Sequence, residues 1–163
     1  MRFVVAILLS ATAAIASPSK SPENHPSRVA KRNTHVIWVG DTINPETTYA
    51  EIGDEIEFHF KRGTHSVVES NFGSPCSPNG GFSSGDITNS DNNGVNGYII
   101  DITDDSTLWF YNGASDRCHK KGDVGVINPP QNADKTLFEY YKAAKDQSTT
   151  VNAKKNGGYL ASF

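Results

Sequence analysis

The side chains in this chain that could bind a metal are few. Beyond residue 32 they are four histidines and two cysteines: His35, His59, His65, His119, Cys76 and Cys118. Imidazole and thiolate groups are common ligands of copper and zinc. The stretch WFYNGASDRCHKKGDVG, residues 109–125, places Cys118 beside His119 between two strand-like segments. This loop is therefore either part of a metal site or one half of a disulfide.

The positions of the histidines give them different expected roles. His59 lies on the polar side of the alternating segment 55–60, so we expect it to face solvent. His35 shares a strand face with two apolar residues and is expected to pack. His65 and His119 lie in loops that flank strands, where functional residues concentrate. No nucleophile elbow, zinc-protease motif or phosphate-binding loop is present, so we expect no enzyme.

The N-terminus has the features of a secretory signal peptide. The apolar run FVVAILLSATAAIA, residues 3–16, follows one arginine and ends in a small-x-small pattern, which predicts a signal peptide over residues 1–16. The run is shorter than the roughly 20 apolar residues that a membrane-spanning helix needs. We therefore expect a secreted, extracellular protein without a membrane span.

Residues 17–32 are rich in Ser, Pro and charge and end in the dibasic pair Lys31-Arg32. Such a segment has too little apolar surface to fold. It is either an N-terminal linker or a pro-segment removed by a dibasic protease, and we favour removal, which leaves Asn33 as the first residue.

The charge of the remaining chain excludes one class of partner. Residues 1–32 hold five of the fifteen Lys and Arg residues and one of the eighteen Asp and Glu residues. The rest carries ten basic and seventeen acidic residues, a net charge near −7. Nucleic-acid binding needs a basic face, so it is not expected. We expect a monomer with one domain over residues 33–130, followed by a helix and tail over residues 131–163.

An even cysteine count in a secreted chain favours a disulfide, here between Cys76 and Cys118. It would close a loop of about 43 residues, and the chain-entropy estimate of its stabilisation is about 4 kcal/mol.

Alternating apolar residues and turn signals predict a mostly β-structure. Residues 71–97 are an irregular excursion rich in Gly, Ser and Asn, and residues 133–147 show the apolar spacing of a helix. These features predict an all-β Greek-key sandwich with a C-terminal helix. The predicted strands are residues 34–39, 55–60, 66–70, 97–102, 107–111 and 123–128.

Several runs carry a resemblance to a known family. EIGDEIEFHF, GTHSVVESNFGSPC, LWFY, GDVGVINPP and a helix containing KAAK occur in this order within residues 35–146. The chain thereby resembles the fungal secreted cupredoxin-like proteins, also called extracellular serine-rich proteins. The resemblance implies a plastocyanin-like sandwich. In members with a blue-copper site it implies four ligands: the histidine of His-Ser-Val-Val, a cysteine after Trp-Phe-Tyr, a histidine before the later cysteine, and a methionine after the next glycine.

Only the first of these ligands is present. His65 matches the histidine of His-Ser-Val-Val, but Asn112 occupies the thiolate position, Arg117 the second histidine position and Asp123 the methionine position. A blue-copper centre requires two imidazoles and a thiolate, so the resemblance implies a degenerate copper site without a bound cofactor. The two cysteines, by contrast, match the disulfide pair of the family.

Two functions remain open. The first is an effector-like binding protein whose partner is a cell-wall or host component, bound through a positive patch at the loop end: Lys61, Arg62, Arg117, Lys120 and Lys121. The second is a protein for electron transfer or metal carriage that holds copper weakly in a non-blue site: His65, His119, Asp123 and Asn112.

Overall fold

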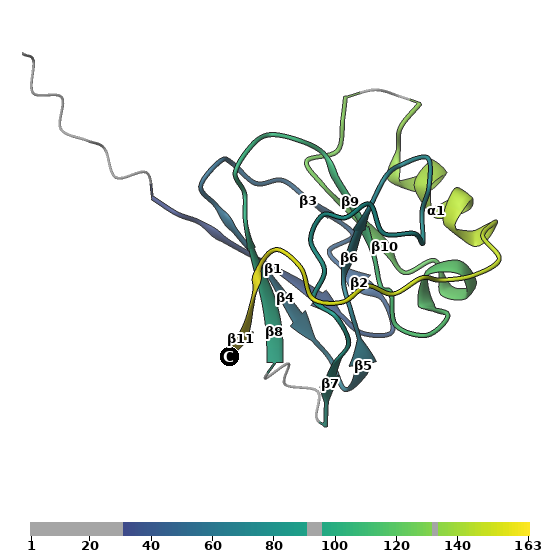
Figure 1. The fold of residues 1–163 in the computed structure, drawn as a ribbon. Coiled ribbons are helices and arrows are strands. Elements are labelled where there is room, and N and C mark those ends of the chain that lie inside the picture. Colours follow the sequence, from purple (N-terminus) through teal and green to yellow (C-terminus); the bar gives the residue numbers. More distant parts are fainter. Residues whose placement is uncertain (1–30, 91–95, 132–133) are drawn as a thin grey trace, which may run out of the picture.

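The computed structural model describes residues 31–90, 96–131 and 134–163. The predicted signal peptide and all of the predicted pro-segment except Lys31-Arg32 lie outside the described residues. Within them the chain forms short strands, one π-helical turn and one α-helix (Figure 1). The predicted all-β sandwich with a C-terminal helix is confirmed. None of the described helices is long and apolar enough to cross a membrane.

The first sheet contains five strands, in the order β11-β8-β4-β1-β2. Its central strands β4 and β1 run parallel, while the other neighbours are antiparallel. The strands are β1 (Thr34–Val39), β2 (Ile43–Asn44), β4 (Glu55–Phe60), β8 (Asn96–Asp101) and β11 (Tyr159–Ser162).

The second sheet contains four strands, in the order β3-β10-β9-β6, and a separate two-stranded ribbon pairs β5 with β7. The strands of the second sheet are β3 (Thr47–Thr48), β6 (Val68–Ser70), β9 (Leu108–Tyr111) and β10 (Val124–Ile127). The ribbon consists of β5 (Gly63–His65) and β7 (Ile87–Asn89).

The alternating residues of strand β4 explain how the two sheets pack on each other. Its residues alternate, and Ile56, Phe58 and Phe60 are fully buried between the sheets.

The prediction that His59 faces solvent needs correction. His59 points away from this core, but the C-terminal Phe163 stacks on its ring at 3.8 Å and the indole of Trp38 meets its edge at 4.9 Å. The tail thus covers a face that looked open in the sequence.

A second core cluster lies between the second sheet and the helix α1 (Leu137–Lys145). Thr136 caps the helix, because its hydroxyl accepts a hydrogen bond from the Glu139 N–H. Tyr140 and Ala144 are buried against the sheet, whereas Tyr141 on the same helix is 40% exposed. The helix is also shorter than the predicted 133–147.

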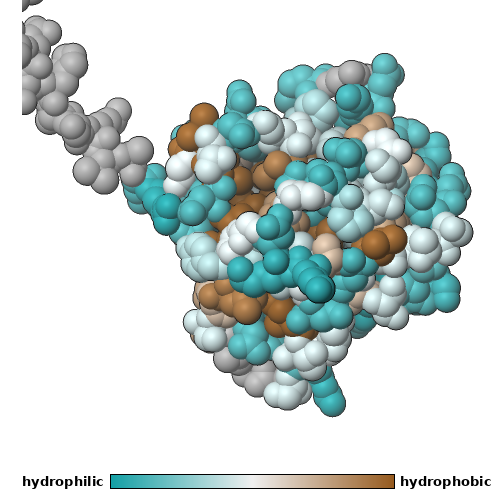
Figure 2. Space-filling view, viewed as in Figure 1, coloured by the Kyte–Doolittle hydropathy of each residue, from teal (hydrophilic) through white to brown (hydrophobic). Residues whose placement is uncertain are grey.

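The residues after the helix return across the sandwich to the first sheet (Figure 1). The tail bridges the 71–97 excursion at Ser83↔Asn156 and then forms β11 beside β8. The helix and tail therefore belong to the same sandwich as residues 33–130. On the face shown in Figure 2, apolar residues surface in separate groups between hydrophilic ones, as is usual for a folded domain.

Candidate functional site

The predicted site residues come from separate segments that end at the same side of the sandwich. His65 is the last residue of β5, Asn112 directly follows β9, and Asp123 directly precedes β10. The loop between β9 and β10 contains the helical turn η1 (Arg117–Lys121). Figure 1 shows this turn beside the C-terminal part of α1. Residues 112–123 were expected to form a loop, and the helical turn within them was not predicted.

Gly122 allows the chain to leave this turn. Its φ of 74° lies in the left-handed region, and a Cβ atom there would approach the ring of Tyr141 to 2.2 Å. The glycine thereby brings η1 against α1 and turns the chain toward Asp123 and β10.

His65 is buried, and both of its ring nitrogens have hydrogen-bond partners. Nε2 donates to the carbonyl oxygen of Arg62 at 3.2 Å, and Nδ1 accepts from the Asn112 side-chain amide at 3.2 Å. Burial lowers the pKa of the His65 imidazole below its ordinary value of 6.5. The ring is therefore held as the neutral tautomer, with its lone pair directed at Asn112.

Asn112 is oriented by the backbone around it. Its Oδ1 accepts hydrogen bonds from the N–H groups of Ser66 at 3.1 Å and Ala114 at 3.2 Å. Because these two donors fix the oxygen, the amide nitrogen must face His65. The residue at the thiolate position of the family thus links the segments that follow β5 and β9.

Asp123 lies next in this network and is also buried. Burial raises the pKa of its carboxyl to about 6, although Arg117 at 3.5 Å and a hydrogen bond from Asn112 lower it. Burial is the larger effect because the contact with Arg117 is long. Arg117 also donates to the Gly40 carbonyl and to Asp41 at 3.0 Å. Sequence reasoning missed Asp41, whose exposed position in a turn gave no signal.

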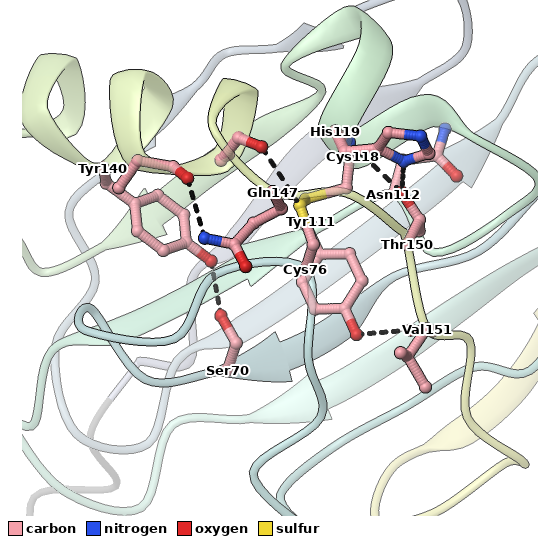
Figure 3. Close-up of a disulfide and its surroundings, with 12 residues drawn as sticks. Ser70, Cys76, Tyr111, Asn112, Cys118, His119, Tyr140, Gln147, Thr150 and Val151 are labelled. Carbon is pink, nitrogen blue, oxygen red and sulfur yellow. Dashed lines mark hydrogen bonds between the residues drawn. A yellow bond between two sulfur atoms is a disulfide. The ribbon is translucent and has the colours of Figure 1, made fainter.

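His119 does not join the other candidate ligands. Its backbone N–H and its ring Nδ1 both bond the Thr150 hydroxyl, at 3.1 and 2.7 Å (Figure 3). Within the described part of the chain, no three His, Cys, Asp or Glu side chains gather where they could hold a metal ion. The predicted metal set of His65, His119 and Asp123 is therefore not assembled. Thr150 lies in the tail, and no sequence pattern pointed to it.

The cysteines answer the question raised by the loop. Cys76 and Cys118 form a disulfide that ties the 71–97 excursion to η1, as predicted (Figure 3). The tail also contacts this excursion, because the Val151 N–H donates to the Cys76 carbonyl at 2.9 Å. Tyr140 of α1 bonds the Ser70 hydroxyl of β6 in the same region. Cys118 is thus unavailable as a thiolate.

The predicted positive patch is smaller than the sequence indicated. Arg117 is paired with Asp41 and Asp123, and only 23% of its side chain is exposed. Lys120 pairs with Asp116 at 2.8 Å, but 64% of its side chain remains exposed. One further cation, Lys145, lies at this surface but was not part of the predicted patch; its ammonium group donates to the Lys120 carbonyl. The other members of the predicted patch lie near the surface: Lys61 is partly exposed over the Trp38 ring at 3.6 Å, and Arg62 and Lys121 are exposed.

Comparison with known proteins agrees with the resemblance found in the sequence. No family model matches the chain. A probable GPI-anchored cupredoxin of Arthroderma benhamiae is 32% identical over 106 residues, which cover 64% of this chain and 53% of that protein. An extracellular serine-rich protein of the same organism is 35% identical over 111 residues, covering 65% and 43%. The chain is similar to fungal cupredoxin-like proteins. It spans about half the length of these curated relatives.

Two solved cupredoxin structures show only a weak structural similarity to this chain. A purple cupredoxin from Nitrosopumilus maritimus has a TM-score of 0.42 and 11% identity, covering 57% of this chain and 96% of that one. A pseudoazurin from Methylobacterium extorquens AM1 has a TM-score of 0.40 and 14% identity, covering 72% and 87%. These scores are low, so the cupredoxin-like assignment rests on the two sequence relatives and the sandwich itself.

The residues present do not fit a blue-copper ion. The thiolate position holds Asn112, whose amide has no thiolate chemistry, and the His65 lone pair already accepts a hydrogen bond from it. The position of the second histidine holds the cation Arg117, which repels a metal ion and pairs with Asp123 instead. In this chain, the positions that the resemblance assigns to the copper ligands instead form a buried hydrogen-bond network.

Proposed function

We propose that this chain is a secreted, non-enzymatic binding protein built on a cupredoxin-like scaffold whose copper site has become structural. The observation that carries this proposal is that both ring nitrogens of His65 are used within the protein. A redox role would require that imidazole to bind copper. The names of the two relatives describe extracellular or surface-anchored proteins, which supports an extracellular location.

The surface that best suits a partner is the exposed side of η1 together with the end of α1. Lys120 and Lys121 project from η1, and Lys145 reaches them from the helix. These lysines form a local cationic surface on a chain that is acidic overall. We propose that this surface, which we call the lysine surface, binds an anionic cell-wall polysaccharide or an acidic face of a host protein.

The lysine surface can be tested without disturbing the buried network. The double substitution Lys120→Ala and Lys121→Ala removes two exposed cations, and we expect weaker binding to an anionic polysaccharide such as polygalacturonate. Binding of the unmodified protein should also weaken as salt rises, because exposed charges are screened. Lys135→Ala is a matched control, since this exposed lysine precedes the opposite end of α1. Equal loss in the control, or binding insensitive to salt, would contradict the proposed surface.

Arg117→Ala is less suitable for this test. Its side chain is mostly covered and lies beside the buried Asp123, so its removal would change stability as well as charge.

The copper alternative is tested with the same protein. Copper binding is measured for the unmodified protein and for His65→Ala. Copper that binds the unmodified protein but not His65→Ala would show that the hydrogen bonds of His65 break to admit a metal.

A further inference from the structure

Three residues meet at the start of β1, away from the candidate site. The buried carboxylate of Asp54 accepts from the backbone N–H of Asn33 at 3.0 Å and from Nε2 of His35 at 2.8 Å. The Glu51 N–H also donates to this carboxylate at 3.0 Å and fixes its position. These residues line a shallow pocket of about 360 Å³.

Cleavage after Arg32 would change this cluster chemically. It would convert the backbone N–H of Asn33 into a primary amine at the same place. It would also remove the Arg32 guanidinium, which now bonds the carboxylates of Glu55 at 2.7 Å and Asp101 at 2.9 Å. The cleaved chain would therefore have a new nitrogen donor at the Asp54 carboxylate, and the carboxylates of Glu55 and Asp101 would have lost their cation.

The new N-terminal sequence would be Asn33-Thr34-His35, with a histidine at the third position. A free amine, the next two backbone amides and a third-position imidazole can supply four nitrogens in one plane. Square-planar nitrogen donors select Cu(II) or Ni(II). We propose that removal of the pro-segment creates a Cu(II) site from the Asn33 amine, the Thr34 and His35 amides and the His35 imidazole.

Asp54 fits the role of a supporting residue in this site. Histidines that bind metals usually donate their other ring N–H to a carboxylate, which fixes the ring orientation. Here Nε2 of His35 is directed at Asp54, which leaves Nδ1, the nitrogen nearer the backbone, for the metal. A coordinated amine keeps N–H groups, so the Asn33 contact with Asp54 can persist as well. Asp54 can thus hold both ends of the chelate.

Copper binding also has a structural cost. β1 pairs with β4 from Thr34↔Glu55 onward, so the chain must curl around the metal and open the first two pairs of this ladder, Thr34↔Glu55 and His35↔Ile56. The two amides must also lose their protons when the metal binds. The site is independent of the Asn112 network, and it depends on cleavage rather than on the proposed binding function.

The test compares two forms of the same chain. One is secreted by a host with a dibasic protease and starts at Asn33; the other comes from a host without it and retains Lys31-Arg32. Each is titrated with Cu(II) against a competing chelator, and the bound metal is examined by electron paramagnetic resonance. We expect the cleaved form to bind one Cu(II) with four nitrogen donors and to hold it in the presence of a chelator that strips Cu(II) from the uncleaved form, because only the cleaved form has the Asn33 amine.

Substitutions in the cleaved form then identify the ligands. His35→Ala, or acetylation of the Asn33 amine, should abolish the tight site, and Asp54→Asn should weaken it by about 10–100-fold. His119→Ala is the matched control and should leave the site unchanged. Circular dichroism checks that each variant is folded. Equal affinity of the cleaved and uncleaved forms, or tight binding that survives acetylation, would overturn the proposal. So would a natural secreted product that does not begin at Asn33.

Discussion

The side-chain amide of Asn112 donates to Nδ1 of His65 at 3.2 Å, while its oxygen accepts from the N–H groups of Ser66 and Ala114. Asn112 therefore donates a hydrogen bond to the lone pair of the imidazole and also accepts hydrogen bonds from two buried backbone N–H groups. A cysteine at this position could do neither equally well, because a thiol is a weak donor and acceptor. The hydrogen bond to the His65 lone pair and the stability of this end of the sandwich therefore depend on the same residue.

Asn112→Cys should not restore a blue-copper centre. The change supplies the thiolate, but Arg117 still occupies the second histidine position and His119 remains bonded to Thr150. We expect no intense visible absorption after addition of Cu(II). We also expect the free energy of unfolding to fall by about 2–5 kcal/mol, since two buried N–H groups lose their acceptor.

These outcomes are checked by visible spectroscopy and urea denaturation. Asn152→Ala is a control for loss of an amide that is partly exposed, and it should cost less stability than the change at Asn112. An intense blue band in Asn112→Cys, or in the unmodified protein, would show that the remaining ligands can still assemble.

The contribution of Asp123 to the free energy of unfolding should become less favourable as pH rises. Burial raises its folded-state pKa to about 6 from 3.8, so between these values the folded state binds more protons than the unfolded state. Its unfavourable contribution is absent below pH 4 and complete above pH 6, where it amounts to about 3 kcal/mol. Asp123→Asn should therefore gain stability relative to the unmodified protein as pH rises from 4 to 7.

The comparison of the two proteins at each pH isolates this residue from the others. His65 acts in the opposite direction: its folded-state pKa is lowered, so its protonation removes stability as pH falls below about 6.5. Urea denaturation at pH 4.5 and 7.0 measures the difference. A difference between Asp123→Asn and the unmodified protein that does not change with pH would mean that Asp123 titrates normally.

Loss of the disulfide should destabilise the fold and loosen the 71–97 excursion. Replacing both Cys76 and Cys118 by alanine removes a cross-link between residues 42 positions apart, and the entropic estimate of the loss is about 4 kcal/mol. Hydrogen exchange should rise first in the excursion and at Val151, which donates to the Cys76 carbonyl. Unchanged stability, or faster exchange in β4 alone, would argue against this role.

The hydroxyl of Tyr140 should contribute to docking of α1 on the second sheet. Tyr140→Phe leaves the buried Ser70 hydroxyl without its partner, and we expect a loss of about 1–2 kcal/mol in urea denaturation. Tyr141→Phe on the same helix is the matched control. Its side chain is 40% exposed, so the change should stay within about 0.5 kcal/mol. Equal effects would mean that the helix does not depend on this contact.

Local patterns in the sequence were sufficient for the disulfide and for six of the strands, β1, β4, β6, β8, β9 and β10, but not for the short strands β2, β3, β5 and β7. The alternation of Glu55–Phe60 predicted β4 and its buried face, because successive strand residues point to opposite sides. Two cysteines in a chain with an apparent signal peptide could pair in only one way within the molecule. The resemblance to cupredoxin-like proteins implied that Asn112 stands at the thiolate position, and its residue type alone excludes a thiolate there.

The tertiary structure decided which of these residues meet. β11 was not predicted, because Tyr159 and Leu160 are exposed and the segment shows no alternation of apolar and polar residues. It is a strand because its backbone pairs with β8. His119 bonds Thr150 and Arg117 pairs with Asp41. Both partners are distant in sequence, so neither contact could be predicted. Side-chain pairing across loops depends on where the backbone brings them, and no local periodicity encodes it. The sequence therefore determined the sandwich and the identity of Asn112, while only the tertiary structure determined that the lone pair of His65 is occupied by a hydrogen bond from Asn112.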